Sequence, residues 1–74
     1  MTTRLANPDM VRGYLDGLDP NSPEPSANRS HSYRHGFANG RDDLHASPRA
    51  AAQTIRELAD QAMAADEAIA REAQ

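Results

Sequence analysis

The sequence contains no cysteine among its 74 residues. Without a thiol, the chain can form neither a disulfide nor a thiolate metal site, which suits a reducing compartment. No apolar run approaches the roughly 20 residues of a membrane-spanning helix, and residues 1–7 lack the apolar stretch of a signal peptide. We therefore expect a cytoplasmic protein without a membrane partner.

Large apolar side chains are also scarce, and a chain of this length forms one domain at most. Those available are Leu5, Met10, Val11, Tyr14, Leu15, Leu18, Tyr33, Phe37, Leu44, Ile55, Leu58, Met63 and Ile69. Fully burying each contributes about 1.5–3 kcal/mol, whereas ordering the chain costs about 1.5 kcal/mol per residue. Because the core alone is thin, we expect a homodimer or a bound partner.

Lysine is absent, so every fixed side-chain cation is an arginine, and the formal net charge is −3. Residues 1–49 carry six arginines and six acidic residues, whereas residues 50–74 carry the whole excess of negative charge. Within the balanced part, residues 26–41 contain three arginines and two histidines but no acid. This distribution predicts a basic patch beside an acidic C-terminal segment.

The sequence predicts a single all-α domain over residues 1–74, with its first helix over about 8–18. Asn7 is a favourable N-cap and Pro8 a favourable first helical residue, while Pro20 disfavours helix just before it. Apolar residues spaced by three and four predict the core-facing side of this helix: Val11, Tyr14, Leu15 and Leu18.

A loop over residues 19–30 separates this helix from the second one. Its three prolines favour stiff, extended backbone. The second helix is predicted over about 29–44, beginning near Asn28 or Ser30. Its large apolar residues lie along one face: Tyr33, Phe37 and Leu44. We expect the two helices to form a short antiparallel hairpin.

The third helix is predicted over about 48–73, with Ser47 as the N-cap and Pro48 in the first turn. This segment is rich in alanine and would span about 39 Å as a helix. Its apolar residues follow a heptad pattern: Ala51, Ile55, Leu58, Ala62, Ala65 and Ile69. Two interpretations stay open. Either the first half covers the hairpin and the rest frays, or the helix binds a partner or forms a homodimer through these residues.

A Tyr-x-x-Gly-apolar motif occurs twice, within residues 13–18 and 32–37. On a helix, residues three apart lie on one face, so each glycine leaves a notch beside a tyrosine where another helix can approach. These positions are the predicted structural residues of the hairpin: Tyr14, Gly17, Tyr33, Gly36 and Phe37. The glycines either serve packing alone or also expose backbone or a ring to a ligand.

The segment Arg12-Gly13-Tyr14-Leu15-Asp16-Gly17-Leu18, the proline-containing loop, and Ser32-Tyr33-Arg34-His35-Gly36-Phe37 together resemble ribosome modulation factor. The resemblance covers about residues 12–44, and similar short reading frames are common in bacteriophages. It implies a two-helix protein that binds ribosomal RNA and ribosomal proteins and promotes inactive ribosome dimers. The matching positions are Arg12, Tyr14, Gly17, Tyr33, Gly36 and Phe37.

The chain departs from that family in its charge. Family members are strongly basic before the first helix, whereas here Arg4 and Arg12 are set against Asp9 and Asp16, and an acidic third helix follows. RNA affinity depends largely on the neutralisation of phosphates, so a net charge of −3 disfavours direct nucleic-acid binding.

No residue pattern predicts an enzyme, a cofactor or a metal. The sequence has neither a Gly-x-Ser-x-Gly elbow nor a glycine-rich phosphate loop. His31 and His35 are four residues apart and could face one ion, with acids and a third histidine following: Asp42, Asp43 and His45. Zinc needs three or four ligands, so a polar helix face is the favoured interpretation.

Two clusters are candidates for partner binding. Arg29, Arg34 and Arg41 could contact phosphates beside the aromatic rings, although the rings are expected on the core face. Asp60, Asp66 and Glu67 could face a basic surface of a partner. The first hypothesis is therefore a non-catalytic regulator of a nucleoprotein complex, similar to ribosome modulation factor. The alternative is a phage or mobile-element inhibitor of the anti-CRISPR type, which blocks the nucleic-acid-binding surface of a host defence complex.

Overall fold

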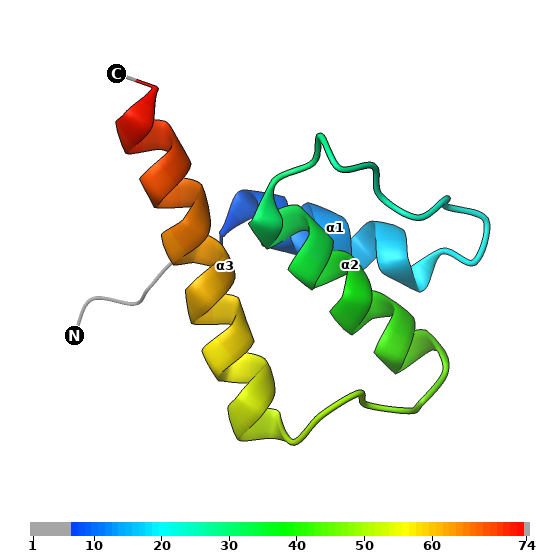
Figure 1. Cartoon of the computed structure of the whole chain (residues 1–74). Coiled ribbons are helices and arrows are strands. Elements are labelled where there is room, and N and C mark those ends of the chain that lie inside the picture. The colour runs from blue at the N-terminus through cyan, green and yellow to red at the C-terminus, as the bar shows by residue number, and fades with distance from the viewer. Residues whose placement is uncertain (1–6, 74) are drawn as a thin grey trace.

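The computed structural model describes residues 7–73, and it consists of three helices in this range. They are α1 (Pro8–Leu18), α2 (His31–Leu44) and α3 (Ala52–Glu72) (Figure 1). The all-α prediction is confirmed. None of the described helices is long and apolar enough to cross a membrane. Leu5, a candidate core residue, and Arg4 lie outside the described residues.

The caps of α1 and α2 follow from the residues that precede them. The Asn7 side chain accepts a hydrogen bond from the Met10 amide at 3.1 Å, and the Ser30 hydroxyl accepts one from the Tyr33 amide at 3.0 Å. Each cap satisfies an amide that the helix leaves without an internal partner. The predicted start of α2 near Ser30 is therefore confirmed.

The predicted start of α3 at residue 48 is wrong, because α3 begins at Ala52 and its N-cap Ala51 makes no side-chain hydrogen bond. Residues 45–51 are instead tied to the end of α2. The Ser47 amide donates to the Asp42 carbonyl at 2.9 Å, and the Arg49 amide donates to the Asp42 carboxylate at 3.2 Å. These contacts hold the segment in a non-helical conformation. The helix then continues without interruption to Glu72.

The antiparallel orientation predicted for the first two helices is also wrong. The Ser30 hydroxyl donates to the Asp9 carboxylate at 2.9 Å near the starts of the helices, and Arg41 donates to the Gly17 carbonyl at 2.9 Å near their ends. The two helices therefore run parallel, with their N-terminal ends together and their C-terminal ends together. The loop between them runs back beside the helices (Figure 1). Extended backbone covers roughly 3.3 Å per residue, so the loop is long enough to return along α1.

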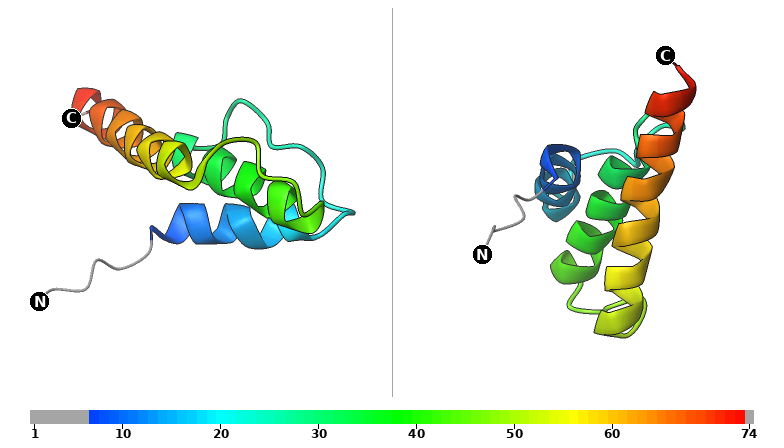
Figure 2. Two further views of the ribbon diagram at one scale, coloured as in Figure 1. Left: turned by 90° about the horizontal axis from the view of Figure 1, so that it is seen from below. Right: turned by 90° about the vertical axis from the view of Figure 1, so that its left-hand side faces the viewer.

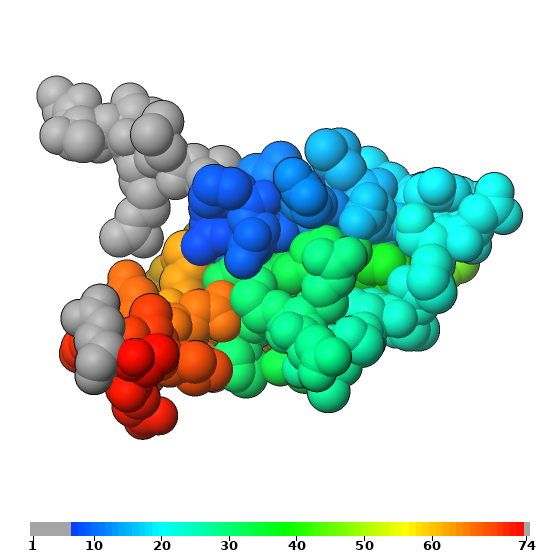
Figure 3. Space-filling model, turned by 90° about the horizontal axis from the view of Figure 1, so that it is seen from above, coloured from blue at the N-terminus to red at the C-terminus, as the bar shows by residue number. Residues whose placement is uncertain are grey.

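α2 is the central helix of the three, with α1 against one side and α3 against another (Figure 2). In the view from above, α1 lies beside the beginning of α2, and the C-terminal half of α3 lies against that same end (Figure 3). α3 runs antiparallel to α2, because Asp66 contacts the start of α2 whereas Arg49 contacts its last turns. The N-terminal turn of α2 is therefore the place where α1 and α3 both contact α2.

Glycines form the contact between α1 and α2. A Cβ atom at Gly36 would overlap the Met10 carbonyl oxygen, and one at Gly13 would overlap the Tyr33 carbonyl oxygen. A Cβ atom at Gly40 would lie 2.9 Å from the Gly17 Cα. The two backbones approach so closely that no other residue type fits without displacing a helix.

The predicted core face of α1 is wrong at two of its four positions for the same reason, whereas Tyr14 and Leu18 are half-buried. α1 turns its glycines toward α2, so Val11 and Leu15 point outward, and Leu15 is 59% exposed. The buried apolar side chains are Tyr33 and Phe37, which are 6% and 2% exposed. The glycines of α1 face α2 because they let the two backbones pack directly against each other. Backbone packing here takes the place of the packing that leucine side chains would provide.

α3 contributes no buried residue. Of its predicted heptad positions, Ile55, Ala62 and Ala65 are half-buried, whereas Leu58 and Ile69 are exposed. α3 therefore lies on the surface of the α1–α2 pair rather than completing a core. A homodimer through this helix stays a prediction.

Candidate functional site

The two tyrosines of the repeated motif make equivalent contacts across the α1–α2 interface. The Tyr33 hydroxyl donates to the Asp16 carboxylate, and the Tyr14 hydroxyl donates to the Asp43 carboxylate, each at 2.5 Å. These hydrogen bonds, reinforced by burial, raise the pKa of both tyrosines above their ordinary value. Both hydroxyl groups are thus engaged within the fold.

Arg41 closes the end of α1. Its guanidinium donates to the carbonyls of Gly17 and Asp19, at 2.9 and 2.7 Å, and also to the carbonyl of Ser22. It lies 4.6 Å from the centre of the Phe37 ring. The guanidinium donors that the sequence analysis assigned to a partner are therefore occupied by backbone oxygens of the end of α1 and of the loop.

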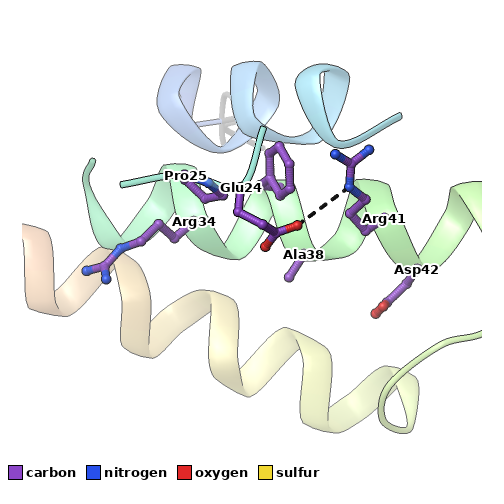
Figure 4. Close-up of a pocket in the computed structure, with 7 residues that line it drawn as sticks. Glu24, Pro25, Arg34, Ala38, Arg41 and Asp42 are labelled. Carbon is purple, nitrogen blue, oxygen red and sulfur yellow. Dashed lines mark ion pairs between the residues drawn. The ribbon is translucent and has the colours of Figure 1, made fainter. Parts of the chain in front are cut away.

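An open groove of about 400 Å³ lies between the loop and α2 (Figure 4). Its lining residues are Glu24, Pro25, Arg34, Phe37, Ala38, Arg41 and Asp42. Glu24 pairs with Arg41 across 3.8 Å, whereas Arg34 points away from that pair (Figure 4). The groove is held together by Arg41 and does not bring the two arginines onto a common ligand position.

Replacing Arg41 by lysine is expected to lower the free energy of unfolding by about 2 kcal/mol, because an ammonium group cannot reproduce the forked contacts to three carbonyls. Urea denaturation followed by circular dichroism measures the change. Arg71→Lys is the matched control, since the Arg71 side chain is 78% exposed and its one ion pair within residues 7–73 is with Glu67 at 3.8 Å. It should change stability by less than about 0.5 kcal/mol. Equal effects of the two variants would contradict the role given to Arg41.

The other two arginines of the predicted basic patch lie near the start of α2. The Arg29 guanidinium is exposed and lies 4.2 Å from the centre of the Tyr33 ring. Arg34 lies on the first turn, with Nη2 at 3.3 Å from Nδ1 of His31. Because Arg41 is engaged at the opposite end of α2, the predicted patch is divided, and Arg29 and Arg34 form its accessible part.

The acids of α3 fall into two groups. Asp60 and Glu67 are exposed. Asp66 instead faces α2, and its carboxylate accepts hydrogen bonds from the amides of His31 and Ser32 at 2.8 and 2.9 Å. Burial favours the neutral form of Asp66, but the hydrogen bonds from Ser32 and His31 outweigh it and hold the pKa below its ordinary value.

His35 belongs to a polar cluster that could not be predicted from the sequence. Nη1 of Arg49 donates to Asn39 at 2.9 Å and to Asp42 at 2.6 Å, while Nη2 lies 3.3 Å from Nδ1 of His35. Burial lowers the pKa of His35, and the charge of Arg49 lowers it further. No sequence signal indicated this cluster, because Arg49 reaches it from the connection before α3.

The two histidines that could have shared a metal have different neighbours: His31 lies beside Arg34, and His35 beside Arg49. Within residues 7–73, no three or more side chains of the metal-binding types are grouped so that they could hold an ion.

Comparisons with known proteins assign no family to this chain. No family model matches it, and neither a curated protein nor a solved structure does. The surfaces described above are therefore the basis for a functional proposal.

Proposed function

We propose that this chain is a non-catalytic protein that binds and regulates a nucleoprotein complex, as the resemblance of residues 12–44 to ribosome modulation factor suggests. The observation that supports this proposal is the outward-facing apolar side of α1. Val11 and Leu15 are exposed although α1 packs closely on α2. In a small protein with so little buried apolar surface, exposed apolar side chains that lie together favour a role in binding.

The proposed contact region, called the α1 surface, is lined by Pro8, Val11, Arg12, Leu15 and Asp16. It is an open groove of about 400 Å³. Arg12 is exposed there and offers a guanidinium for a carboxylate or a phosphate. The other positions that match ribosome modulation factor are engaged in the α1–α2 contact, so Arg12 is the matching residue best placed to meet a partner.

The second candidate function is inhibition of a host defence complex, and the charge of α3 favours it. The exposed acids of this helix are Glu57, Asp60, Glu67 and Glu72, against the exposed arginines Arg56 and Arg71. Such a surface suits contact with a basic groove that otherwise binds nucleic acid. Under this alternative, the contact would lie on α3 rather than on the α1 surface.

Co-sedimentation with purified ribosomes of the source organism tests the first proposal, with a reconstituted CRISPR effector complex as the second target. We expect the wild-type chain to sediment with ribosomes. The double variant Val11→Ser, Leu15→Ser should bind at least tenfold more weakly. The control Leu58→Ser, Ile69→Ser, which removes apolar groups of similar exposure from α3, should bind normally.

Two results would contradict the first proposal. One is binding to the effector complex without binding to ribosomes, and the other is loss of ribosome binding in the α3 control only. The salt dependence adds a further criterion, since direct phosphate contacts weaken steeply as the salt concentration rises, whereas apolar contacts do not.

A further inference from the structure

The side of α2 that faces α3 and the connection before it (residues 45–51) is polar. Its residues are Ser32, His35, Asn39 and Asp42. α3, which contributes no buried residue, lies against this side. Burying polar groups beneath an alanine-rich helix gains little, so the hydrophobic contribution to this contact is small. Polar contacts at the two ends, through Asp66 and Arg49, do most to hold α3 in place.

His35 is the buried titratable residue of this polar side, with 9% of its surface exposed. Nδ1 of its ring lies 3.3 Å from Nη2 of Arg49, and Nε2 lies 3.2 Å from Nδ2 of Asn39. A guanidinium only donates hydrogen bonds, so Nδ1 accepts from Arg49 and carries no hydrogen of its own. Because an imidazolium carries a hydrogen on both nitrogens, the contact with Arg49 requires a neutral His35.

No acid is placed to balance a positive charge on His35. Within residues 7–73, neither ring nitrogen is hydrogen-bonded to a carboxylate. The titratable groups that face α2 from its neighbours are bound elsewhere: Asp9, Tyr14 and Asp16 of α1 to Ser30, Asp43 and Tyr33, Arg49 to Asp42, and Asp66 of α3 to the amides of His31 and Ser32. The other half-buried residues of α3 are uncharged: Ile55, Ala59, Ala62, Met63 and Ala65. Arg56, which lines a groove with Asn39, adds a second cation.

Protonation of His35 would therefore place two positive charges side by side. Like charges repel more strongly in a partly buried cluster than in water. Burial lowers the pKa of His35 below its ordinary value of 6.5, and the charge of Arg49 lowers it further. A group of this kind stabilises the fold fully above its ordinary pKa, and this contribution is lost as the pH falls through the lowered pKa. The contact with Arg49 is thus complete at neutral pH and is lost on acidification.

Arg49 ties the connection to α2 through one rigid group. Nη1 of its guanidinium donates to Asn39 at 2.9 Å and to Asp42 at 2.6 Å, while Nη2 faces His35. Because the guanidinium is planar, Nη2 cannot turn away from the ring without moving Nη1 as well. α3 begins at Ala52, three residues after Arg49. A change at the ring of His35 is therefore passed to the start of α3.

The other end of α3 is not affected in the same pH range. Hydrogen bonds from Ser32 and His31 hold the pKa of Asp66 below its ordinary value of 3.8, although burial acts in the opposite direction. Asp66 therefore stays ionised at a pH where a histidine gains a proton, and it keeps its contacts with the first amides of α2.

We propose that His35 is a pH-sensitive switch for α3. Its protonation expels the Arg49 guanidinium from the polar cluster and frees the start of α3 from α2, while Asp66 keeps the C-terminal half of α3 attached. The change uncovers the half-buried residues at the start of α3, of which Ile55 is the largest. This switch lies apart from the α1 surface and goes beyond the function proposed above.

The test is a pH titration of the ¹³C,¹⁵N-labelled full chain at constant ionic strength, from about pH 8 to about pH 4.5, the range in which a histidine gains its proton. The ring signals of His35 report its protonation, and the amide signals of Arg49, Ala52 and Ile55 report the start of α3. We expect His35 to titrate below its ordinary value and the three amide signals to shift with the same midpoint. The proposal is overturned if His35 does not titrate in this range, or if it titrates while the amide signals stay unchanged.

His35→Asn removes the titrating group while its amide oxygen, close to the position of Nδ1, can still accept a hydrogen bond from Arg49. The shift of the Ala52 and Ile55 amide signals should disappear in this variant. His45→Asn is the matched control, because it removes an exposed histidine that lies outside the cluster, and it should keep the transition. A transition that persists in His35→Asn would assign it to another group and contradict the proposal.

Arg49→Gln examines the same contact from the other side and does not depend on how well His35→Asn folds. Without the neighbouring charge, the pKa of His35 should rise toward its ordinary value, and the Ile55 amide signal should no longer follow it. An unchanged pKa of His35 would show that the guanidinium does not face the ring, and the proposal would fail. Ribosome binding through the α1 surface should not depend on His35, so the two proposals fail separately.

Discussion

Replacing Gly36 by alanine is expected to push α1 away from α2 and to lower the free energy of unfolding by about 2 kcal/mol. The added methyl group would overlap the Met10 carbonyl oxygen, which is a backbone atom and cannot rotate away. Overpacking of this kind destabilises a protein by up to about 3 kcal/mol. The better helix propensity of alanine stabilises it by about 1 kcal/mol, so the net loss is about 2 kcal/mol. For a domain of this size, the melting temperature should fall by roughly 8–16 °C.

The sign of this effect is the decisive measurement. In an exposed helix, a change from glycine to alanine stabilises by about 1 kcal/mol, so a rise in melting temperature for Gly36→Ala would mean that the backbones are not in contact. Gly13→Ala should also destabilise, because its methyl group would overlap the Tyr33 carbonyl oxygen. Ala64→Gly, at an exposed position of α3, measures the propensity contribution alone.

The positions of the helices could be predicted from the sequence because local chemistry determines them. Asn7 and Ser30 cap the helices with their own side chains, and the caps depend on residues only three positions away. The exception is the start of α3. Ser47 and Pro48 are a favourable pair for a helix start, but the local preference is overridden by the contacts of Arg49 with Asp42.

The arrangement of the helices could not be predicted in the same way. The apolar stripe of α1 indicated an inward face at Val11 and Leu15, yet the glycines face inward because they allow a closer contact than leucine would. The parallel orientation depends on the loop. The prolines of the loop indicated extended backbone. They did not indicate that the loop would return along α1, where Arg41 of α2 binds the Gly17 and Asp19 carbonyls at the end of that helix.

The sequence indicated which charged residues make important contacts better than it indicated what those residues contact. Arg41 and Asp66 were chosen from the sequence as charges for a partner, and both are engaged with backbone groups of the protein itself. A charge pattern indicates where charged side chains occur but not which of them meet unsatisfied backbone groups. To tell the two cases apart, the positions of the helix ends in three dimensions must be known. Contacts between residues far apart in the sequence determine those positions.

Replacing Phe37 by alanine is expected to have the largest effect of any single apolar substitution in the described residues. The Phe37 ring is 2% exposed, lies 6.4 Å from the Tyr33 ring, and is covered by the guanidinium of Arg41. Truncation of a buried phenylalanine costs about 3–5 kcal/mol, which is comparable to the whole stability of a small domain. A large fraction of the molecules should therefore be unfolded at 25 °C, which lowers the helical circular dichroism signal.

Leu15→Ala is the matched comparison for Phe37→Ala, because Leu15 was the other strong candidate for the core but is 59% exposed. It should change the free energy of unfolding by less than about 0.5 kcal/mol. Phe37→Leu, which keeps most of the apolar volume, should lose much less stability than Phe37→Ala. If Leu15→Ala were instead the more damaging change, α1 would have to pack through its apolar stripe, and the α1 surface would no longer be available for a partner.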